Sequence, residues 1–322
     1  MSEQIRRSEF EIIAQVLAPL SHGADLAFDL SDDAALIEPR PGQCMVVTAD
    51  ALVAGVHFPH DEAADLIARK ALRVNLSDLA AMGADPLAYF MTIAVPPDID
   101  DAWIELFAKG LAQDQPKFAI TLAGGDIVST PNELVLSITM LGSVASKAVI
   151  RRNGAQVGDR VYVSGTIGDA ALGLVALNGE LGTTDASELI ARYCLPQPRL
   201  ALGAALRGLV HSGTDISDGL VADLLHICET SHVGAVIRAE SIPLSDPARK
   251  ALQQEPELLT SVLAGGDDYE LLITASADFD PTAIEGGVAL SEIGEVVGGE
   301  GVTVIGADGE PMALDRGGFR HR

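Results

Sequence analysis

Two hydrophobic periods alternate along this chain, and the alternation limits the fold more than any other feature of the sequence. Short apolar runs bounded by turn residues predict strands at residues 34–39, 44–53, 87–96, 118–124, 134–144 and 160–165, and further strands between Gly and Asp turns within residues 257–322. Apolar residues at helical spacing predict helices within residues 9–19, 61–82, 101–114 and 166–177, after Pro198 and after Ser217. The sequence therefore predicts an α/β fold of mixed helices and strands.

Polar and glycine residues that cluster around RRNGAQVGD, at 151–159, interrupt this pattern and make residues 145–158 the best candidate for a domain boundary. At 322 residues, against roughly 150 per domain, the chain is long for a single core. We therefore expect two mixed α/β domains, residues 1–147 and 148–322. LAGGD occurs at both 122–126 and 263–267, which leaves a duplication of one domain open.

The composition narrows the class of partner. Hydrophobic residues make up 48% and charged residues 21% of the chain, which excludes a disordered protein. The formal charge of −25 makes neither nucleic acid nor an anionic membrane an expected partner. Three cysteines without Cys-x-x-Cys spacing indicate no disulfide framework or zinc site, and no signal peptide or membrane-spanning run is evident. We expect a cytoplasmic protein that binds small molecules and cations.

Two aspartates occupy positions where a carboxylate is costly. Asp78 falls on the apolar stripe of the helix predicted at 61–82, and Asp50 lies inside a predicted strand, where aspartate is disfavoured. Burying an ionised carboxylate costs several kcal/mol unless a cation or several donors meet it. Pairing of Asp78 with Lys70 or Arg73 would explain it structurally, although the spacings within one helix are poor.

The segment TDISDGLVADLL, residues 214–225, begins another helix. Ser217 fits the N-cap position and Asp218 fits the first turn, where the helix dipole favours an acid. Asp215 precedes the cap in an uncharged stretch, and no structural role accounts for it. Asp223 lies off these positions, so we expect it to be a solvated surface acid.

Further aspartates adjoin predicted strands. Asp126 follows two glycines, an arrangement that lets the backbone approach a bulky ligand and that also serves as a plain turn. Five acids would repel one another if they converged, by roughly 3 kcal/mol per pair about 5 Å apart; they are Asp33, Asp50, Asp78, Asp126 and Asp215. Carboxylates without a His or Cys cluster select hard ions such as Mg²⁺, whose usual partners are substrate phosphates. The hypothesis that follows is phosphate chemistry.

The group that would recognise the phosphate is less defined. The chain lacks a Gly-x-x-x-x-Gly-Lys-Ser/Thr loop and the catalytic motifs of a protein kinase. SGTIGDAALGL leads from a glycine turn into a helix N-terminus, which suits either an anion site or a structural turn. Arg152, in the boundary stretch, is a candidate counter-charge.

An ordered set of motifs between residues 31 and 272 resembles one family closely. The motifs are SDDAALI, ADALVAGVHF, KALRVNLSDLAAMGADP, LAGGD, RRNGAQVGD, VSGTIGDAALGL, TDISDGLVADL and GGDDYELL. Together they resemble the thiamine-monophosphate kinases, of the superfamily that includes aminoimidazole ribonucleotide synthetase and selenophosphate synthetase. The resemblance implies a homodimer, with the N-terminal sheet forming the dimer contact and helices on one side of the C-terminal sheet. It also implies direct in-line transfer of the γ-phosphoryl group of ATP to thiamine monophosphate.

The resemblance also implies a role for each matching residue. The N-terminal domain would bind ATP and metal, and the C-terminal domain would bind substrate and complete the metal site. The Mg²⁺ ligands would be Asp33, Thr48, Asp50, Asp78, Asp126, Asp215 and Asp218. ATP would meet Gly125, Asp126, Arg152 and Ser217, of which Asp126 and Arg152 would be catalytic, and thiamine monophosphate would meet His57, Asp267 and Phe319.

Three positions depart from the family pattern. Ser31 replaces a usual glycine, Ala49 replaces a common threonine, and Asp267 replaces a glutamate, so the substrate contact is one methylene shorter. Two other functions stay open: an ATP-dependent ligase of the same superfamily, and a sensor of metal or nucleotide that does not turn over. Selenophosphate synthetase is disfavoured because no reactive cysteine lies near the N-terminus, and a carbamoyl dehydratase because the chain ends in FRHR.

Overall fold

The structure is a computed structural model, and it describes residues 7–182, 186–313 and 318. The chain forms two compact units. The first comprises Met1–Leu79 and Asp85–Ala145, and the second comprises Ala80–Ala84 and Ser146–Arg322. The junction at residues 145 and 146 falls in the candidate boundary region described above, whereas no feature of the composition indicates that residues 80–84 belong to the second unit.

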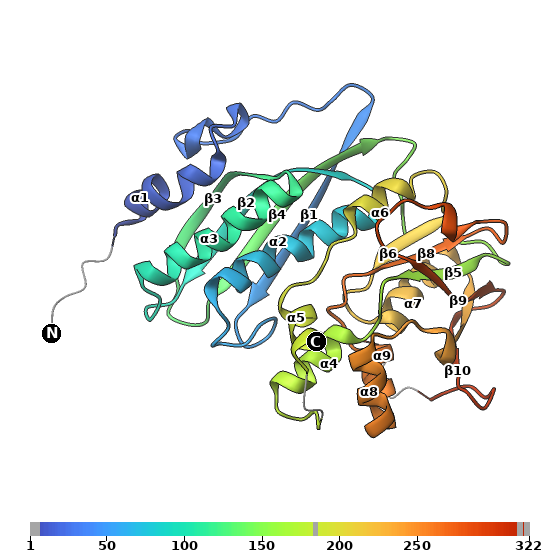
Figure 1. Cartoon of the computed structure of the whole chain (residues 1–322). Helices are drawn as coiled ribbons and strands as arrows, with labels where there is room; N and C mark the ends of the chain where they lie inside the picture. Colours follow the sequence, from blue (N-terminus) through green and yellow to red (C-terminus); the bar gives the residue numbers. More distant parts are fainter. Residues whose placement is uncertain (1–6, 183–185, 314–317, 319–322) are drawn as a thin grey trace. The chain divides into compact units, whose positions relative to one another are not determined.

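The first unit contains a four-stranded sheet with the strand order β1-β4-β2-β3 (Figure 1). Its strands are β1 (Gln43–Val53), β2 (Asp85–Val95), β3 (Thr121–Ser129) and β4 (Val135–Ala145). β4 is antiparallel to β1 and to β2, while β2 and β3 are parallel. The strand predicted at 34–39 is wrong. That apolar run pairs with none of the described strands, and its Leu36 is 61% exposed.

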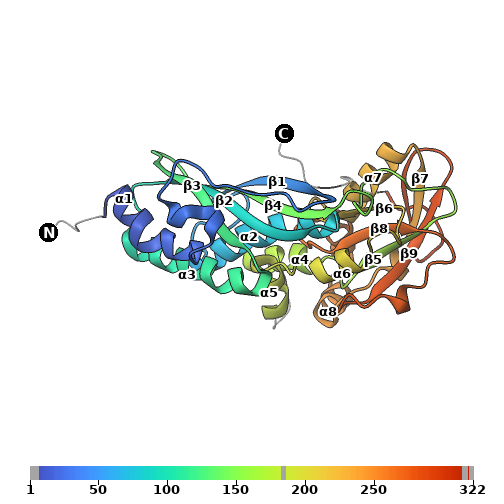
Figure 2. The same ribbon diagram turned by 90° about the horizontal axis from the view of Figure 1, so that it is seen from above.

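Helices cover one face of this sheet. They are α2 (Ala64–Ala81) and α3 (Asp101–Phe118), which lie side by side beneath the strands in Figure 2. Alternate residues of β4 point toward them, and Leu136, Ile138 and Met140 are fully buried there. In the described part of the chain no helix covers the other face, where Val47 is 60% exposed.

The helix predicted at 9–19 is built from three short pieces. α1 (Glu9–Ile12) continues as a π-helix over Ile13–Leu17 and a 3₁₀-helix over Ala18–Ser21, and a further 3₁₀-helix spans Asp25–Leu30. Ser8 caps α1, because its hydroxyl accepts the Glu11 N–H while the Glu11 carboxylate accepts the Ser8 N–H.

A buried ion pair joins α2 to α3. The Arg73 guanidinium donates from Nε to Asp114 Oδ2 at 2.6 Å and from Nη2 to Asp114 Oδ1 at 3.0 Å. Both side chains are 1% exposed, and Arg69 adds a contact from Nε to Asp114 Oδ1 at 3.3 Å. This bidentate geometry commits Arg73 to α3.

The second unit contains a six-stranded sheet with the order β10-β7-β9-β5-β8-β6. Its strands are β5 (Arg160–Ser164), β6 (Ser212–Asp215), β7 (Gly234–Arg238), β8 (Leu271–Ala275), β9 (Leu290–Val297) and β10 (Gly301–Ile305). Only β10 and β7 are parallel; the other neighbours are antiparallel.

Alternate strand residues point to opposite faces of this sheet, and within the described ranges six helices pack on these two faces. Val161 and Val163 of β5 face the larger apolar cluster, which takes residues from α4 (Asp169–Leu177), α5 (Ser187–Cys194), α7 (Leu220–Ser231), α8 (Asp246–Gln254) and α9 (Leu259–Ala264). Tyr162 faces a smaller cluster that contains Leu202 of α6 (Leu200–Ala205). The expectation of helices on one side is correct for five of them, and α6 is the exception. None of the helices in the described ranges is long and apolar enough to cross a bilayer.

Candidate functional site

Three oxygen-bearing side chains of the first unit lie together between β1 and α2. Thr48 and Asp50 alternate along β1 and therefore point to the same face of the sheet, toward Asp78 of α2. The Thr48 hydroxyl donates to Asp78 Oδ2 at 2.5 Å. Burial, followed by the neighbouring charge of Asp78 and a hydrogen bond between the two carboxyl groups, raises the pKa of Asp50 to about 7. The sequence correctly singled out Asp50 and Asp78 as acids in costly positions.

This group fits a magnesium ion by the chemistry of its donors. It offers one hydroxyl and two carboxyl groups, all hard oxygen ligands. Two carboxyl groups side by side repel each other unless they share a proton. A divalent cation can take the place of that proton. The donor set of Thr48, Asp50 and Asp78 therefore fits a divalent cation.

The shared proton makes the stability of the metal-free protein depend on pH. Because the folded pKa of Asp50, about 7, lies above the value of about 4 in an unfolded chain, its contribution is fully present below pH about 4 and is lost as the pH rises through about 7. Relative to Asp50→Asn, we expect the free energy of unfolding of the wild type to fall by up to about 1.4 kcal/mol per pH unit over that range. Urea unfolding in the presence of a chelator measures this difference, and identical pH slopes for the two proteins would contradict it.

Asp126 does not join this group within one chain. β1 and β3 are the two edge strands of the sheet, so three strand spacings, about 14 Å, separate them. Asp126 also pairs with exposed Thr92 on the uncovered face, whereas Asp50 pairs with buried Ile138 on the helix-covered face. Both carboxylates of one chain therefore cannot bind a single Mg²⁺ at about 2.1 Å.

The glycine before Asp126 is required by the backbone. Gly125 has a φ of 156°, and a Cβ at this position would lie 1.9 Å from the carbonyl oxygen of Met91. Only glycine lets β3 approach β2 this closely. The structure thus gives Gly125 a role in strand packing, whether or not a ligand binds nearby.

Two further candidates of the first unit lie in loops. Asp33 is exposed and precedes an irregular segment rather than a strand. His57 is held in place by its backbone and its ring, since Lys70 Nζ donates to the His57 carbonyl at 3.0 Å and the Val53 N–H donates to His57 Nδ1 at 3.0 Å. A nitrogen that accepts a hydrogen bond carries no proton, so the neutral ring is protonated at Nε2 and can donate from there.

In the second unit, one candidate lies at the end of β6 and three lie in loops near it. Asp215 is the last residue of β6 and is 2% exposed. The next loop carries Ser217 and Asp218, and the Asp267 N–H donates to the Ser217 carbonyl at 2.9 Å. Asp267 has a φ of 69°, an uncommon conformation for aspartate, and its Oδ1 accepts from the Tyr269 hydroxyl at 3.2 Å. Local backbone pairing therefore brings the two motifs TDISD and GGDDYE together.

Arg152 lies beside the same strand. Its Nε donates to the Thr214 hydroxyl at 3.2 Å, and Thr214 is the residue before Asp215. The side chain is exposed, which leaves the rest of the guanidinium accessible to solvent. The second unit thus brings Arg152, Asp215, Ser217, Asp218 and Asp267 to one region. Phe319 lies outside the described residues.

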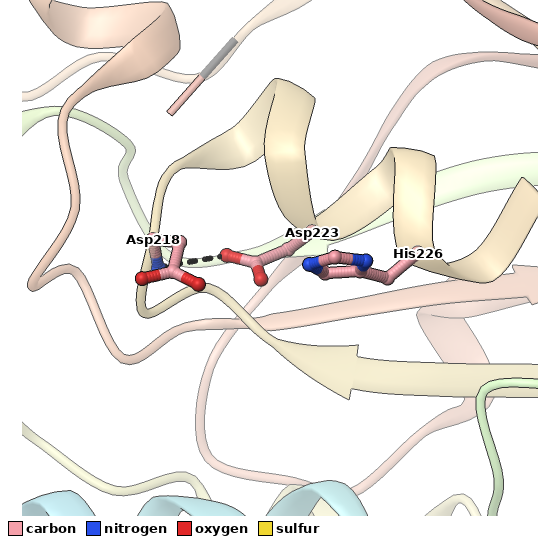
Figure 3. A group of neighbouring side chains, drawn as sticks. All are labelled: Asp218, Asp223 and His226. Carbon is pink, nitrogen blue, oxygen red and sulfur yellow. Dashed lines mark hydrogen bonds between the residues drawn. The ribbon is translucent and has the colours of Figure 1, made fainter. Parts of the chain in front are cut away.

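Three predictions for the helix that follows are wrong. α7 begins at Leu220 with Gly219 as its N-cap, so Ser217 does not cap it and Asp218 lies before the helix rather than in its first turn. Asp223 is not a solvated acid: it is 1% exposed, and its carboxylate accepts backbone N–H groups of the preceding loop (Figure 3). Burial, and then the charge of Asp218, raise the pKa of Asp223 to about 6 against the opposing effect of those hydrogen bonds. The burial of Asp223 was missed because this residue lies off the apolar stripe of the helix. The available signal was the Ser-Asp-Gly loop just before the helix, since its N–H groups need an acceptor.

The glycine turn at the start of α4 proves to be structural. Asp268, which is fully buried, accepts the Gly168 N–H at 2.6 Å and the Ala170 N–H at 3.3 Å, so a carboxylate of the protein already fills this helix N-terminus. Burial raises the pKa of Asp268 to about 8 despite these bonds. Neighbouring Glu270 is also buried and binds both Arg192 and Arg199. The sequence reading missed this network because its members are spread over residues 164–270.

Comparisons with known proteins find relatives over nearly the full length of the chain. The family models described as AIR synthase related protein, N-terminal domain and C-terminal domain, match residues 31–144 and 156–307. A thiamine-monophosphate kinase of Caulobacter vibrioides is 46% identical over 316 residues, which are 95% of this chain and 90% of that protein. The chain belongs to the thiamine-monophosphate kinase family. Another member of the thiamine-monophosphate kinase family, from Escherichia coli K12, is 40% identical over 97% of this chain and 98% of its own.

Solved structures of the thiamine-monophosphate kinase family share the fold. The crystal structure from Stenotrophomonas maltophilia K279a has a TM-score of 0.83 at 40% identity and covers 95% of this chain and 98% of that one. AaThiL complexed with AMPPCP and TMP has a TM-score of 0.79 at 30% identity and covers 90% and 91%. The hydrogenase maturation protein HypE in complex with ATP, at 16% identity and a TM-score of 0.78, shows a common fold alone. The predicted family and mixed α/β fold are confirmed.

Proposed function

We propose that this protein transfers the γ-phosphoryl group of ATP to thiamine monophosphate and so forms thiamine diphosphate and ADP. Membership of the thiamine-monophosphate kinase family supports the activity, and the AaThiL complex with AMPPCP and TMP supports the two substrates. Within the chain, the observation that carries the chemistry is the group of Thr48, Asp50 and Asp78, whose oxygens suit Mg²⁺.

In this proposal the candidate residues divide among three ligands, which are Mg²⁺, ATP and thiamine monophosphate. Thr48, Asp50 and Asp78 hold Mg²⁺ in the first unit, with Asp33 and Asp126 as further ligands. Asp215 and Asp218 are the remaining proposed metal ligands. Gly125, Asp126, Arg152 and Ser217 meet ATP, and His57, Asp267 and Phe319 meet thiamine monophosphate. The exposed guanidinium of Arg152 supports its assignment to an anionic group.

The proposed reaction needs positioning and cancellation of charge more than it needs proton transfer. A terminal oxygen of thiamine monophosphate attacks the γ-phosphorus of ATP, and the bond to the oxygen of ADP breaks. The acceptor phosphate is largely ionised near neutral pH, so no residue has to act as a general base. Bound Mg²⁺ would supply the positive charge that lets two anionic phosphates approach each other. Arg152 adds charge at the transferring group, and His57 and Asp267 orient the acceptor.

Incubation with ATP, Mg²⁺ and thiamine monophosphate tests the proposal directly. Formation of thiamine diphosphate together with ADP is the expected result. Formation of ADP only with an amidine-forming ligase substrate would assign the chain to the ligases instead. Binding of nucleotide without any product would assign it to the sensors.

A homodimer would reconcile the position of Asp126 with a role in the metal site. The uncovered face of the first unit's sheet is flanked by two edge strands, with Asp50 on β1 and Asp126 on β3. Its exposed apolar side chains, such as Val47 at 60% and Val128 at 42% exposure, support contact with a second copy. In such a dimer the edge strand β3 of one copy would lie beside the edge strand β1 of the other, and Asp126 would reach Asp50 around that edge. Within one chain the two residues are about 14 Å apart.

A mixed dimer distinguishes the two arrangements. Asp50→Asn and Asp126→Asn homodimers are expected to be inactive, because each would lack one ligand in both sites. A heterodimer of the two variants, isolated with different affinity tags, should recover about half of the wild-type activity because one of its two sites has both ligands intact. A heterodimer as inactive as its parents would show that each chain builds its site alone.

A further inference from the structure

A single carboxylate oxygen holds the loop between β6 and α7. Asp223 Oδ2 accepts the backbone N–H of Ser217 at 3.0 Å, of Asp218 at 3.0 Å and of Gly219 at 3.1 Å. Three consecutive amides that converge on one oxygen form an anion-binding nest, and here the anion belongs to the protein itself. Because Asp223 is 1% exposed, water cannot readily replace it as the acceptor.

The same loop is fixed from its other side. The Asp267 N–H donates to the Ser217 carbonyl at 2.9 Å, and the Tyr269 N–H donates to the Ile216 carbonyl at 2.8 Å. Gly219 has a φ of 127°, and a Cβ there would lie 2.7 Å from the Ala264 carbonyl oxygen, so the loop has little freedom to move. The position of the Ser217 and Asp218 side chains therefore depends on where the Asp223 oxygen sits.

Asp223 could in principle have a different task. Its carboxylate, that of Asp218 and the imidazole of His226 offer atoms that all lie within 4.8 Å of one another, and Asp223 stands between the other two in Figure 3. Such a group could hold a metal ion. However, one Asp223 oxygen already accepts three hydrogen bonds, and this use explains both its burial and its orientation.

We propose that Asp223 is a positioning residue of the kinase site, which sets the loop of Ser217 and Asp218 by accepting its three N–H groups and does not itself bind an ion. The proposal rests on the function proposed above, because Ser217 and Asp218 are assigned there to ATP and metal. It goes beyond that function by adding a residue that touches neither. Its physical content is that an acceptor oxygen is needed at this point in space, whereas the negative charge matters less.

Two conservative variants separate an acceptor from a metal ligand. Asp223→Asn keeps an oxygen in place and removes the charge, while Asp223→Glu keeps the charge and moves the oxygens by one methylene. We expect Asp223→Asn to lose no more than about threefold in kcat/KM for ATP, and Asp223→Glu to lose about 10- to 100-fold, as is usual when the support of a site is displaced. A metal ligand predicts the reverse order, so a more active Asp223→Glu would overturn the proposal.

Val304→Ala is the matched control for stability. Val304 is 3% exposed and lies on β10 in the same apolar cluster, away from the loop. The kcat/KM of Val304→Ala per folded molecule should equal that of the wild type. The kcat/KM of Asp223→Glu should fall well below that of Val304→Ala, even if the two variants lose the same stability. If Asp223→Glu does not fold, Asp223→Asn decides alone: a loss above about tenfold at normal stability would overturn the proposal.

Hydrogen exchange gives a readout that does not require kinase activity. The amides of residues 217–219 should exchange faster in Asp223→Glu than in the wild type, and at nearly the wild-type rate in Asp223→Asn. A wild-type protein without kinase activity would refute the proposed function but leave this comparison intact. Equal exchange in all three proteins would refute the positioning role even if the kinase activity is present.

Discussion

Replacement of Asp78 by asparagine should lower kcat/KM for ATP by about 10³-fold or more while it stabilises the protein without metal. Asp78 accepts from Thr48 and lies beside Asp50, so the variant loses a proposed ligand but keeps an acceptor for the hydroxyl. At pH about 8 the wild-type carboxylates repel each other, and removal of one charge should raise the free energy of unfolding by about 1–3 kcal/mol. Loss of activity and gain of stability in one variant would be typical of a binding site.

The measurement combines steady-state kinetics with urea unfolding in the presence of a chelator and of Mg²⁺. Mg²⁺ should stabilise the wild type and have little effect on Asp78→Asn. Asp65→Asn, in the first turn of the same helix, is the control for loss of one acidic charge, and its activity should stay near that of the wild type. An Asp78→Asn protein that is active, or that is destabilised without metal, would contradict the proposed role.

Replacement of Asp114 by alanine should destabilise the first unit by about 3–5 kcal/mol. The change leaves the Arg73 guanidinium, 1% exposed, without the carboxylate that accepts two of its hydrogen bonds at 2.6 and 3.0 Å. A buried cation that has lost its counter-ion retains the full cost of desolvation, which is why breaking such a pair costs more than the pair contributes. Urea unfolding at neutral pH measures the effect.

The control is a surface pair of the same kind. Arg249 and Asp246 are 2.9 Å apart, but their side chains are 56% and 82% exposed. Asp246→Ala should therefore cost less than about 1 kcal/mol. If Asp114→Ala cost as little as Asp246→Ala, Arg73 would have found another partner or water, and the pair would not be what fastens α3 to α2.

Periodicity predicted the long elements well because burial imposes it. α2 and β1 each pack one face against a core, and both appear close to the predicted ranges. The run at 34–39 has the same local character as a strand but no described strand beside it to complete a ladder. The motif LAGGD shows that local sequence alone does not determine secondary structure. Its copy at 122–126 lies in β3, whereas its copy at 263–267 ends α9 and enters a loop. Five identical residues take two conformations, so this echo gives no support to a duplicated domain.

In the candidate site, too, local sequence predicted some features, whereas others depend on contacts between distant segments. Asp50 and Asp78 were recognisable because a charge on an apolar stripe or inside a strand is a local anomaly. The distance between Asp50 and Asp126 depends on the strand order β1-β4-β2-β3, which no local pattern encodes. Asp223 was misjudged for a related reason, since its burial follows from the shape of the loop before α7 and not from its own helix.

The small segment at residues 80–84 affects how these proteins could be divided or recombined. Ala80 and Ala81, the last residues of α2, belong to the apolar cluster of Ile150 and Leu202, and Arg207 Nε donates to the Gly83 carbonyl at 2.6 Å. A C-terminal fragment that starts at residue 148 would lack these groups and expose the surface they cover. Recombination of two related genes at that junction would place the end of α2 from one parent against an apolar cluster from the other parent. We therefore expect the two halves of the gene to be inherited together.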